Sequence, residues 1–234
     1  MSLTEERALL SLPYAAPDAT EAYGPHPSQV VDRYGPGNRR RVALLHGGFW
    51  REAYDRRHLA PCARALADLD FEVALVEYRR VGNGGGWPAS YRDVRRAVRR
   101  GEVVVGHSAG GQLALLLASA GVGPVVAVAP VADLALADEL GLSGGAVASF
   151  LGGVACAEAD PMARLPLRAP VRLLHGADDA EVPVSLSRRY AAAAGVPLRV
   201  LDGVGHYAPI TPGTAAFAEL VAMLASQPSP THHP

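Results

Sequence analysis

The stretch Glu102–Ala120, EVVVGHSAGGQLALLLASA, constrains the fold of this chain more than any other. The β-branched run Val103–Val105 predicts a short buried strand, and the alanine- and leucine-rich end of the stretch predicts a helix. Between them lies a G-x-S-x-G turn centred on Ser108. A strand, this turn and a helix together are typical of a nucleophile elbow, in which the serine occupies a strained turn. The alternative is a glycine-rich turn whose serine only caps the helix.

Composition and charge limit the class of protein. The chain has 234 residues, of which 49% are hydrophobic, and this predicts a single α/β domain over residues 1–226. A formal net charge of −1 gives no indication of a nucleic-acid partner. No window approaches 18 uninterrupted apolar residues, so no membrane span is expected. Glu5 and Glu6 interrupt any signal-like start, and Cys62 and Cys156 make no disulfide framework, so we expect a reduced, cytoplasmic setting.

Expected strands and helices alternate along the chain. Strands are expected over 29–34, 41–45, 71–78, 103–105, 125–129, 171–174 and 198–201, and helices over 4–11, 56–69, 90–99, 184–194 and 214–226, besides the one that follows Ser108. This alternation predicts an α/β fold with a doubly wound, mostly parallel sheet and helices on both faces. Residues 13–27 are expected to be irregular, 130–170 to form a small cap or loop excursion, and 227–234 a disordered tail.

A catalytic serine needs a base within hydrogen-bond reach and an acid that orients the base. In the arrangement that follows a nucleophile elbow, the acid comes later in the chain, at the carboxyl end of a strand. Asp178 and Asp179 stand there, after the strand over 171–174. Asp179 begins the pattern Asp-x-x-Val-Pro, and Asp178 does not, so Asp179 is the predicted acid and Asp178 the alternative. A plain solvated turn would also place adjacent aspartates here.

The predicted base is His206. Of the eight histidines, it is the one that follows the last expected strand, in Gly203-Val204-Gly205-His206-Tyr207. Its neighbouring glycines would let this loop fold back over Ser108. The chain order Ser108, Asp179, His206 favours a catalytic triad over an ordinary polar loop residue.

An oxyanion hole requires backbone N–H groups aimed at the oxygen that becomes negative. Ala109 follows the predicted nucleophile directly and would supply one N–H group. The loop His46-Gly47-Gly48-Phe49-Trp50 follows an earlier strand, and Gly48 is the first choice for the second donor, with Phe49 as a further one. The alternative for paired glycines after a strand is a tight turn without a role in catalysis.

Aromatic residues near these loops predict an apolar pocket for a small substrate. Trp50, Trp87 and Tyr207 are the predicted substrate-binding residues, although ordinary packing beneath loops would explain each of them. No H-x-x-x-H or C-x-x-C pair predicts a metal, and Gly82–Gly86 lacks the Lys-Ser/Thr of a phosphate-binding loop. We therefore expect no metal and no organic cofactor. The arginines over 92–100 are interpreted as a solvated helix face.

Six motifs occur in the order found in the α/β-hydrolase superfamily: HGGFW, EYRR (77–80), WPASYRDV (87–94), GHSAGG, HGADDAEVP (175–183) and the Gly-His of 205–206. From about residue 29 to the last helix, the chain resembles small lidless bacterial esterases of the hormone-sensitive-lipase-like and prolyl-oligopeptidase-like groups. HGG-aromatic-Trp also resembles arylformamidases (kynurenine formamidases). In two respects the chain departs from these groups: only Arg100 and Gly101 separate the helix near Arg99 from the next strand, and residues 130–170 are too few for a large lid. A peptidase propeller is also absent.

This resemblance implies a serine hydrolase that cleaves a small ester or an activated amide through an acyl-enzyme, with a small-molecule substrate, no nucleic acid and no membrane as partners and an oligomeric state left open. Ser108 would be the nucleophile, His206 the base and Asp179 the residue that orients the base. One alternative is an arylformamidase, which would cleave an N-formyl aryl amide. The other is a binding protein that has kept the fold without the activity.

Overall fold

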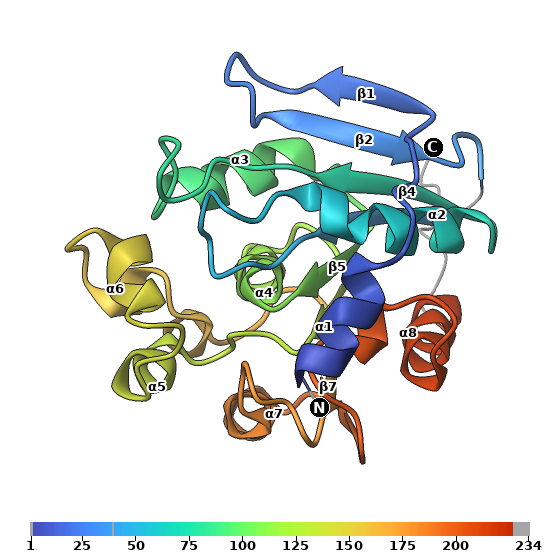
Figure 1. The fold of residues 1–234 in the computed structure, drawn as a ribbon. Coiled ribbons are helices and arrows are strands. Elements are labelled where there is room, and N and C mark those ends of the chain that lie inside the picture. The colour runs from blue at the N-terminus through green and yellow to red at the C-terminus, as the bar shows by residue number, and fades with distance from the viewer. Residues whose placement is uncertain (1, 39, 227–234) are drawn as a thin grey trace.

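The computed structural model describes residues 2–38 and 40–226, which build one eight-stranded sheet in the order β1-β2-β4-β3-β5-β6-β7-β8 (Figure 1). The strands are β1 (Ala19–Ala22), β2 (Val30–Tyr34), β3 (Arg40–Leu45), β4 (Phe71–Val76), β5 (Val103–His107), β6 (Val125–Val128), β7 (Val171–Gly176) and β8 (Leu198–Leu201). The pairings from β4 through β8 are parallel, whereas β1 and β2 add an antiparallel edge. The predicted mostly parallel, doubly wound sheet is confirmed.

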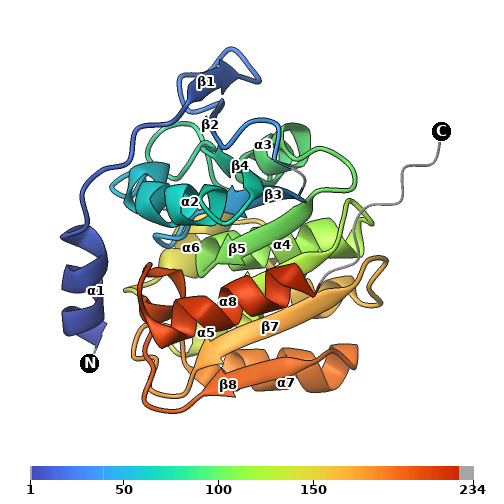
Figure 2. The same ribbon diagram turned by 90° about the vertical axis from the view of Figure 1, so that its right-hand side faces the viewer.

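Helices cover both faces of this sheet (Figure 2). The α-helices are α1 (Ser2–Leu10), α2 (Ala60–Ala67), α3 (Ala89–Ala97), α4 (Ala109–Ser119), α5 (Leu134–Glu139), α6 (Ala146–Leu151), α7 (Val184–Ala194) and α8 (Ala215–Ala225), and the short 3-10 helices are η1 (Arg56–Leu59), η2 (Cys156–Glu158), η3 (Pro161–Arg164) and η4 (Ala208–Ile210). Helices α3, α4 and α7 pack on one face, and α2 and α8 pack on the other.

The alternation of side chains along the strands explains why the sheet needs cover on both sides. In β3, Val42 and Leu44 belong to the core under α2 and α8, while Ala43 and Leu45 belong to the core under α4. Successive side chains of a strand point to opposite faces, and in a parallel sheet both faces are apolar. The result is two cores separated by the sheet, with the carboxyl ends of the strands left to carry loops.

Two segments contain more regular structure than their sequence predicts. Strand β1 lies inside the stretch predicted to be irregular. All four of its residues are exposed and lack apolar alternation, so its pairing with β2 gives no local sequence signal. Residues 130–170 contain α5, α6, η2 and η3. The tail predicted over 227–234 lies outside the described residues.

Helix α1 stands apart from the two layers. Figure 2 shows it to one side of the sheet and its covering helices, with an extended segment leading away from it toward β1. Leu9 anchors the helix in the core under α2, where its side chain is 2% exposed. This position brings the N-terminal helix next to η4 and the loop that precedes it.

Candidate active site

Ser108 lies on a sharp turn between β5 and α4. Its φ of 55° and ψ of −119° fall in a region that residues other than glycine rarely adopt. A Cβ added to Gly106 would lie 2.3 Å from the carbonyl oxygen of Gly110. One added to Gly110 would lie 2.4 Å from the carbonyl oxygens of Leu45 and His46. The two glycines of the G-x-S-x-G motif are therefore required by the close approach of strand, turn and helix.

The structure brings His206 and Asp179 together. His206 Nδ1 lies 2.6 Å from Asp179 Oδ2, and both side chains are buried. Since the carboxylate accepts, Nδ1 carries the hydrogen and Nε2 is the other ring nitrogen. Asp178, the alternative acid, is exposed, and its N–H donates to the carbonyl of Val204. The geometry thus distinguishes two adjacent aspartates that share one turn.

Further hydrogen bonds hold the carboxylate of Asp179 in place. Its Oδ1 accepts from the N–H groups of Glu181 and Val182 at 2.9 and 2.8 Å, and Nε2 of His175 lies 3.2 Å from its Oδ2. Burial alone would raise the pKa of Asp179. The contacts with His175 and His206 outweigh burial and hold that pKa well below its usual range. Asp179 is therefore ionised at neutral pH and oriented from several directions.

His107, the second residue of the G-x-S-x-G motif, supports the loop that carries His206. His107 Nε2 lies 3.1 Å from the carbonyl oxygen of His206, and the two rings are 4.5 Å apart. A carbonyl oxygen can only accept, so Nε2 of His107 donates. Burial, together with the nearby His206, lowers the pKa of His107 well below its usual value. The motif places His107 in the turn but does not predict this contact.

A cavity of about 310 Å³ opens at Ser108 and His206. Helix α1, the HGGFW loop and the loops after β7 and β8 all contribute to its lining: Glu6, Leu9, Leu10, Gly48, Phe49, Tyr54, His58, His107, Ser143, Glu181 and Tyr207. Of the predicted residues, the cavity gathers the nucleophile, the base, both donors of the HGGFW loop and Tyr207. Ala109 follows Ser108 as the first residue of α4.

The HGGFW loop turns through three consecutive residues of positive φ: Gly48 at 98°, Phe49 at 47° and Trp50 at 57°. The N–H of Arg51 closes the turn by donating to the carbonyl of Gly48 at 3.0 Å. This turn directs Phe49 to the cavity and Trp50 to the core. A Cβ added to Gly48 would lie 2.3 Å from the Cβ of Tyr54, so a side chain at this position would collide with Tyr54.

The prediction that Trp50 binds substrate is wrong. Its side chain is 0% exposed, stacks on Phe150 at 4.3 Å and donates from Nε1 to Gln112 Oε1 at 3.2 Å. These contacts place the Trp50 side chain against α4 and α6. The Trp50 ring therefore packs in the core beneath the loop and does not line the cavity at Ser108.

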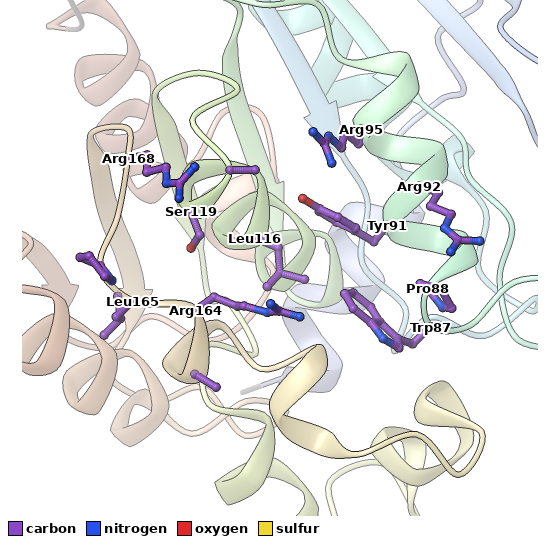
Figure 3. A pocket seen from close by; sticks show the side chains of 13 residues that line it. Trp87, Pro88, Tyr91, Arg92, Arg95, Leu116, Ser119, Arg164, Leu165 and Arg168 are labelled. Atoms are coloured by element: carbon purple, nitrogen blue, oxygen red, sulfur yellow. The ribbon is translucent and has the colours of Figure 1, made fainter.

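Trp87 is also away from Ser108. It lines a different cavity of about 660 Å³ between α3, the C-terminal end of α4 and the segment 163–168, where its ring stacks on Tyr91 (Figure 3). The two cavities share no lining residue. The N–H of Trp87 donates to the carbonyl of Phe150, so its loop is bound to α6. Trp87 is thus near a strand-end loop in sequence but outside the predicted pocket in space.

A buried polar cluster beneath the HGGFW loop was not predicted. His46 Nε2 lies 3.0 Å from Glu77 Oε1, and the hydroxyl of Tyr78 donates to the carbonyl of His46 at 2.8 Å. Burial alone would raise the pKa of Glu77, but His46 and Arg80 outweigh it and lower that pKa to about 2. The EYRR motif after β4 is the signal that marks this cluster. Its acidic and aromatic residues fix the loop that holds the predicted oxyanion donors.

Within the residues that the structure describes, no group of three or more His, Cys, Asp or Glu side chains is arranged to hold a metal ion. No helix in the same part of the chain is long and apolar enough to cross a membrane.

No protein-family model matches this sequence, and no curated protein matches it either. Solved structures do match its fold. Esterase B from Lactobacillus rhamnosis, solved with an inhibitor, has a TM-score of 0.76 at 18% identity and covers 96% of this chain and 92% of its own. The esterase Est2 from Thermogutta terrifontis, with propionate bound, has a TM-score of 0.71 at 18% identity, covering 88% and 92%. An acetyl ester-xyloside bifunctional hydrolase from Caldicellulosiruptor lactoaceticus has a TM-score of 0.71 at 19% identity, covering 89% and 94%.

These similarities, with the mostly parallel sheet and helices on both faces, show that the chain has the α/β-hydrolase fold.

Proposed function

We propose that this protein is a serine hydrolase of small carboxylic esters, with Ser108 as nucleophile, His206 as base and Asp179 as the residue that orients the base. One observation carries the proposal. The contact of 2.6 Å between His206 and Asp179 lies beside the same cavity as Ser108, which sits on a strained turn with a φ of 55°. Strained backbone at such a position is typical of functional sites.

The geometry supports the following reaction. Ser108 Oγ attacks the ester carbonyl carbon as Nε2 of His206 takes its proton, and Asp179 stabilises the resulting imidazolium. Backbone N–H groups of Ala109 and of Gly48 or Phe49 donate to the oxyanion of the tetrahedral intermediate. The alcohol leaves with the proton from His206, and the acyl-enzyme is hydrolysed by water through the same steps. This chemistry draws on protein groups and water.

The cavity favours a short, uncharged substrate. At about 310 Å³ it lies at the lower end of small-molecule pockets, which span roughly 300–1,000 Å³. Leu9, Phe49 and Tyr54 give it apolar walls, and its charged lining residues are the acids Glu6 and Glu181. An anionic acyl group would therefore meet like charge. The acetyl ester and propionate named for two of the structural neighbours agree with a short acyl group.

An arylformamidase is the second candidate, favoured by the aromatic residues at the cavity. Phe49, Tyr54 and Tyr207 line it and could contact an aryl ring. Trp50, the last residue of the HGG-aromatic-Trp motif, cannot do so because its ring is in the core. Binding of an aryl ring would therefore depend on Phe49 and the two tyrosines.

A paired rate assay on the native protein and Ser108→Ala tests both candidates. The substrates are p-nitrophenyl acetate, p-nitrophenyl octanoate and N-formylkynurenine. Fastest turnover of the acetate, abolished by the substitution, is the expected result. Fastest turnover of the formyl amide would assign the arylformamidase instead. Equal, slow rates for both proteins, with no labelling by a fluorophosphonate probe, would leave the non-catalytic binding protein.

A further inference from the structure

The N-terminal helix contributes to the candidate active site. Glu6, Leu9 and Leu10 of α1 line the cavity at Ser108, although they precede Ser108 by about 100 residues in the sequence. Leu9 reaches past the cavity into the core and fixes the helix there. Helix α1 is thus one wall of a site whose other parts come from strand-end loops.

One side chain of this helix binds the backbone on either side of His206. Glu5 Oε1 accepts from the N–H of Gly205 at 2.8 Å, and Glu5 Oε2 accepts from the N–H groups of Tyr207 and Ala208 at 3.0 and 3.1 Å. Hydrogen bonds with an ionised acceptor are stronger than neutral ones. A single carboxylate therefore engages three of the amides that surround His206.

The glycine before His206 makes this approach feasible. A Cβ added to Gly205 would lie 2.8 Å from Glu5 Oε2, and its three nearest neighbours would all be atoms of the Glu5 carboxylate. The φ of Gly205 is outside the left-handed region, so its backbone would accept a side chain. Glycine at this position thus leaves room for the Glu5 carboxylate, which a side chain here would displace.

The nucleophile turn also contacts this loop. His107, next to Ser108, donates to the carbonyl oxygen of His206. The backbone around His206 is therefore contacted by two side chains, His107 at its carbonyl oxygen and Glu5 at the N–H groups of the neighbouring residues. Both contacts act on the backbone, whereas Asp179 acts on the imidazole ring.

We propose that Glu5 is a positioning residue for His206, so that helix α1 completes the active site. The inference rests on the proposed function, because positioning has meaning only if His206 is the base. Without the carboxylate, the N–H groups of Gly205, Tyr207 and Ala208 would lose the acceptor that binds them on either side of His206. A shift of about 1 Å in a catalytic group lowers the rate by roughly 100-fold.

The primary test compares Glu5→Gln and Glu5→Ala with Arg7→Gln, a control on the exposed side of the same helix. Glu5→Gln keeps the shape of the side chain but replaces one acceptor oxygen by a donor. We expect kcat for p-nitrophenyl acetate to fall by about 10- to 100-fold in both Glu5 variants. Glu5 does not line the cavity, so KM should stay within about threefold of the native value. Arg7→Gln should keep the native kcat.

A second test acts from the loop and leaves α1 and all charges intact. Gly205→Ala would push its Cβ against the Glu5 carboxylate, and we expect kcat to fall by about tenfold or more. In the Glu5→Ala background the same Cβ has room, so Gly205→Ala should cost less than threefold there. This non-additivity is specific to a contact between the two residues. Because Gly205→Ala retains Glu5, it tests the inference even if Glu5→Ala does not fold.

Ser108→Ala distinguishes a failure of the proposed function from a failure of the positioning role of Glu5. If Ser108→Ala keeps native activity, the proposed function fails. If Ser108→Ala abolishes turnover while folded Glu5→Gln and Gly205→Ala keep native kcat, the proposed function stands and the role of Glu5 is overturned. A fall in kcat with an equal rise in KM and additive effects in the double variant would also overturn it, since a general loosening of α1 has that signature.

Discussion

Glu77 Oε1 lies 3.0 Å from His46 Nε2, and this buried pair supports the turn that presents Gly48 and Phe49 to the cavity. Arg56 and Arg80 approach the same carboxylate at 3.7 and 3.5 Å. The Glu77 side chain thus connects His46, the first residue of the HGGFW loop, with two arginines of neighbouring segments. The loop with the predicted oxyanion donors therefore depends on a charge that lies outside the cavity.

Replacing Glu77 by Gln should destabilise the protein strongly. The substitution removes the carboxylate that pairs with the buried Arg80, whereas Arg56 keeps its contact with Asp32, and breaking a buried ion pair typically costs about 3–5 kcal/mol. Urea unfolding monitored by circular dichroism measures the change in the free energy of unfolding. Glu219→Gln is the matched control, because it removes the exposed partner of Arg199 and should cost less than about 1 kcal/mol. Equal losses for the two variants would contradict a special role for Glu77.

Asp179→Asn should lower kcat by roughly 10⁴-fold, because the amide cannot stabilise a protonated His206 as a carboxylate does. Asp178→Asn is the control at the adjacent, exposed position and should retain native kcat. Steady-state kinetics on p-nitrophenyl acetate measure kcat for both variants and for the native protein. Loss of activity in Asp178→Asn alone would assign the acid to the other aspartate.

Asp179 should also make the stability of the protein depend on pH. The folded pKa of Asp179 lies below its unfolded value near ~3.9, so the ionised carboxylate stabilises the folded state above that pH. This contribution is lost as the pH falls through the folded pKa. The difference in unfolding free energy between the native protein and Asp179→Asn should be constant from about pH 5 to 7 and shrink below about pH 4. A difference that grows on acidification would contradict the assigned direction.

His107 should make stability depend on pH in a higher range. Its folded pKa lies well below the unfolded value near ~6.5, so the unfolded chain takes up a proton first. Stability should therefore be lost as the pH falls below about 6.5, with a slope of at most about 1.4 kcal/mol per pH unit from this group. In His107→Gln the amide can still donate to the carbonyl of His206. The slope of unfolding free energy between about pH 6.5 and 5 should be smaller in that variant, and an unchanged slope would exclude His107 as its source.

Phe49→Ala should widen the cavity and shift the acyl-chain preference. The side chain of Phe49 is one of its apolar walls, whereas Trp87 lines the separate cavity at α3. We expect the ratio of kcat/KM for p-nitrophenyl octanoate over acetate to rise about tenfold in Phe49→Ala. Trp87→Ala should leave this ratio unchanged. If Trp87→Ala shifts the ratio and Phe49→Ala does not, the substrate occupies the other cavity.

Much of the sheet and several site residues could be predicted because their signals are local. Buried strands appear as short β-branched runs, and the motif residues follow directly at the strand ends. Asp179 could be distinguished from Asp178 by its spacing to Val182 and Pro183, and the N–H of Val182 does donate to its carboxylate. The glycines around Ser108 follow from sterics that a short motif contains in full.

The positions of Trp50 and Glu5 could not be predicted in the same way. Trp50 points into the core because three successive backbone dihedrals are positive, and no pattern of residue types specifies that. Glu5 contacts Gly205, which lies 200 residues later in the sequence, and Glu5 belongs to a helix with weak amphipathic character. A glycine before a loop histidine has many explanations, and only the fold shows that a distant carboxylate needs the space.

The contact between Glu5 and the loop of His206 has a consequence for biosynthesis. Ribosomes extend a chain by about 5–20 residues per second, so Glu5 emerges roughly 10–40 s before its partner amides. The residues around Ser108 are also synthesised in that interval. A nascent chain would thus carry its nucleophile while the base is still absent or unanchored. Hydrolytic competence would be acquired in one late step, when the last strand and its loop dock against the first helix.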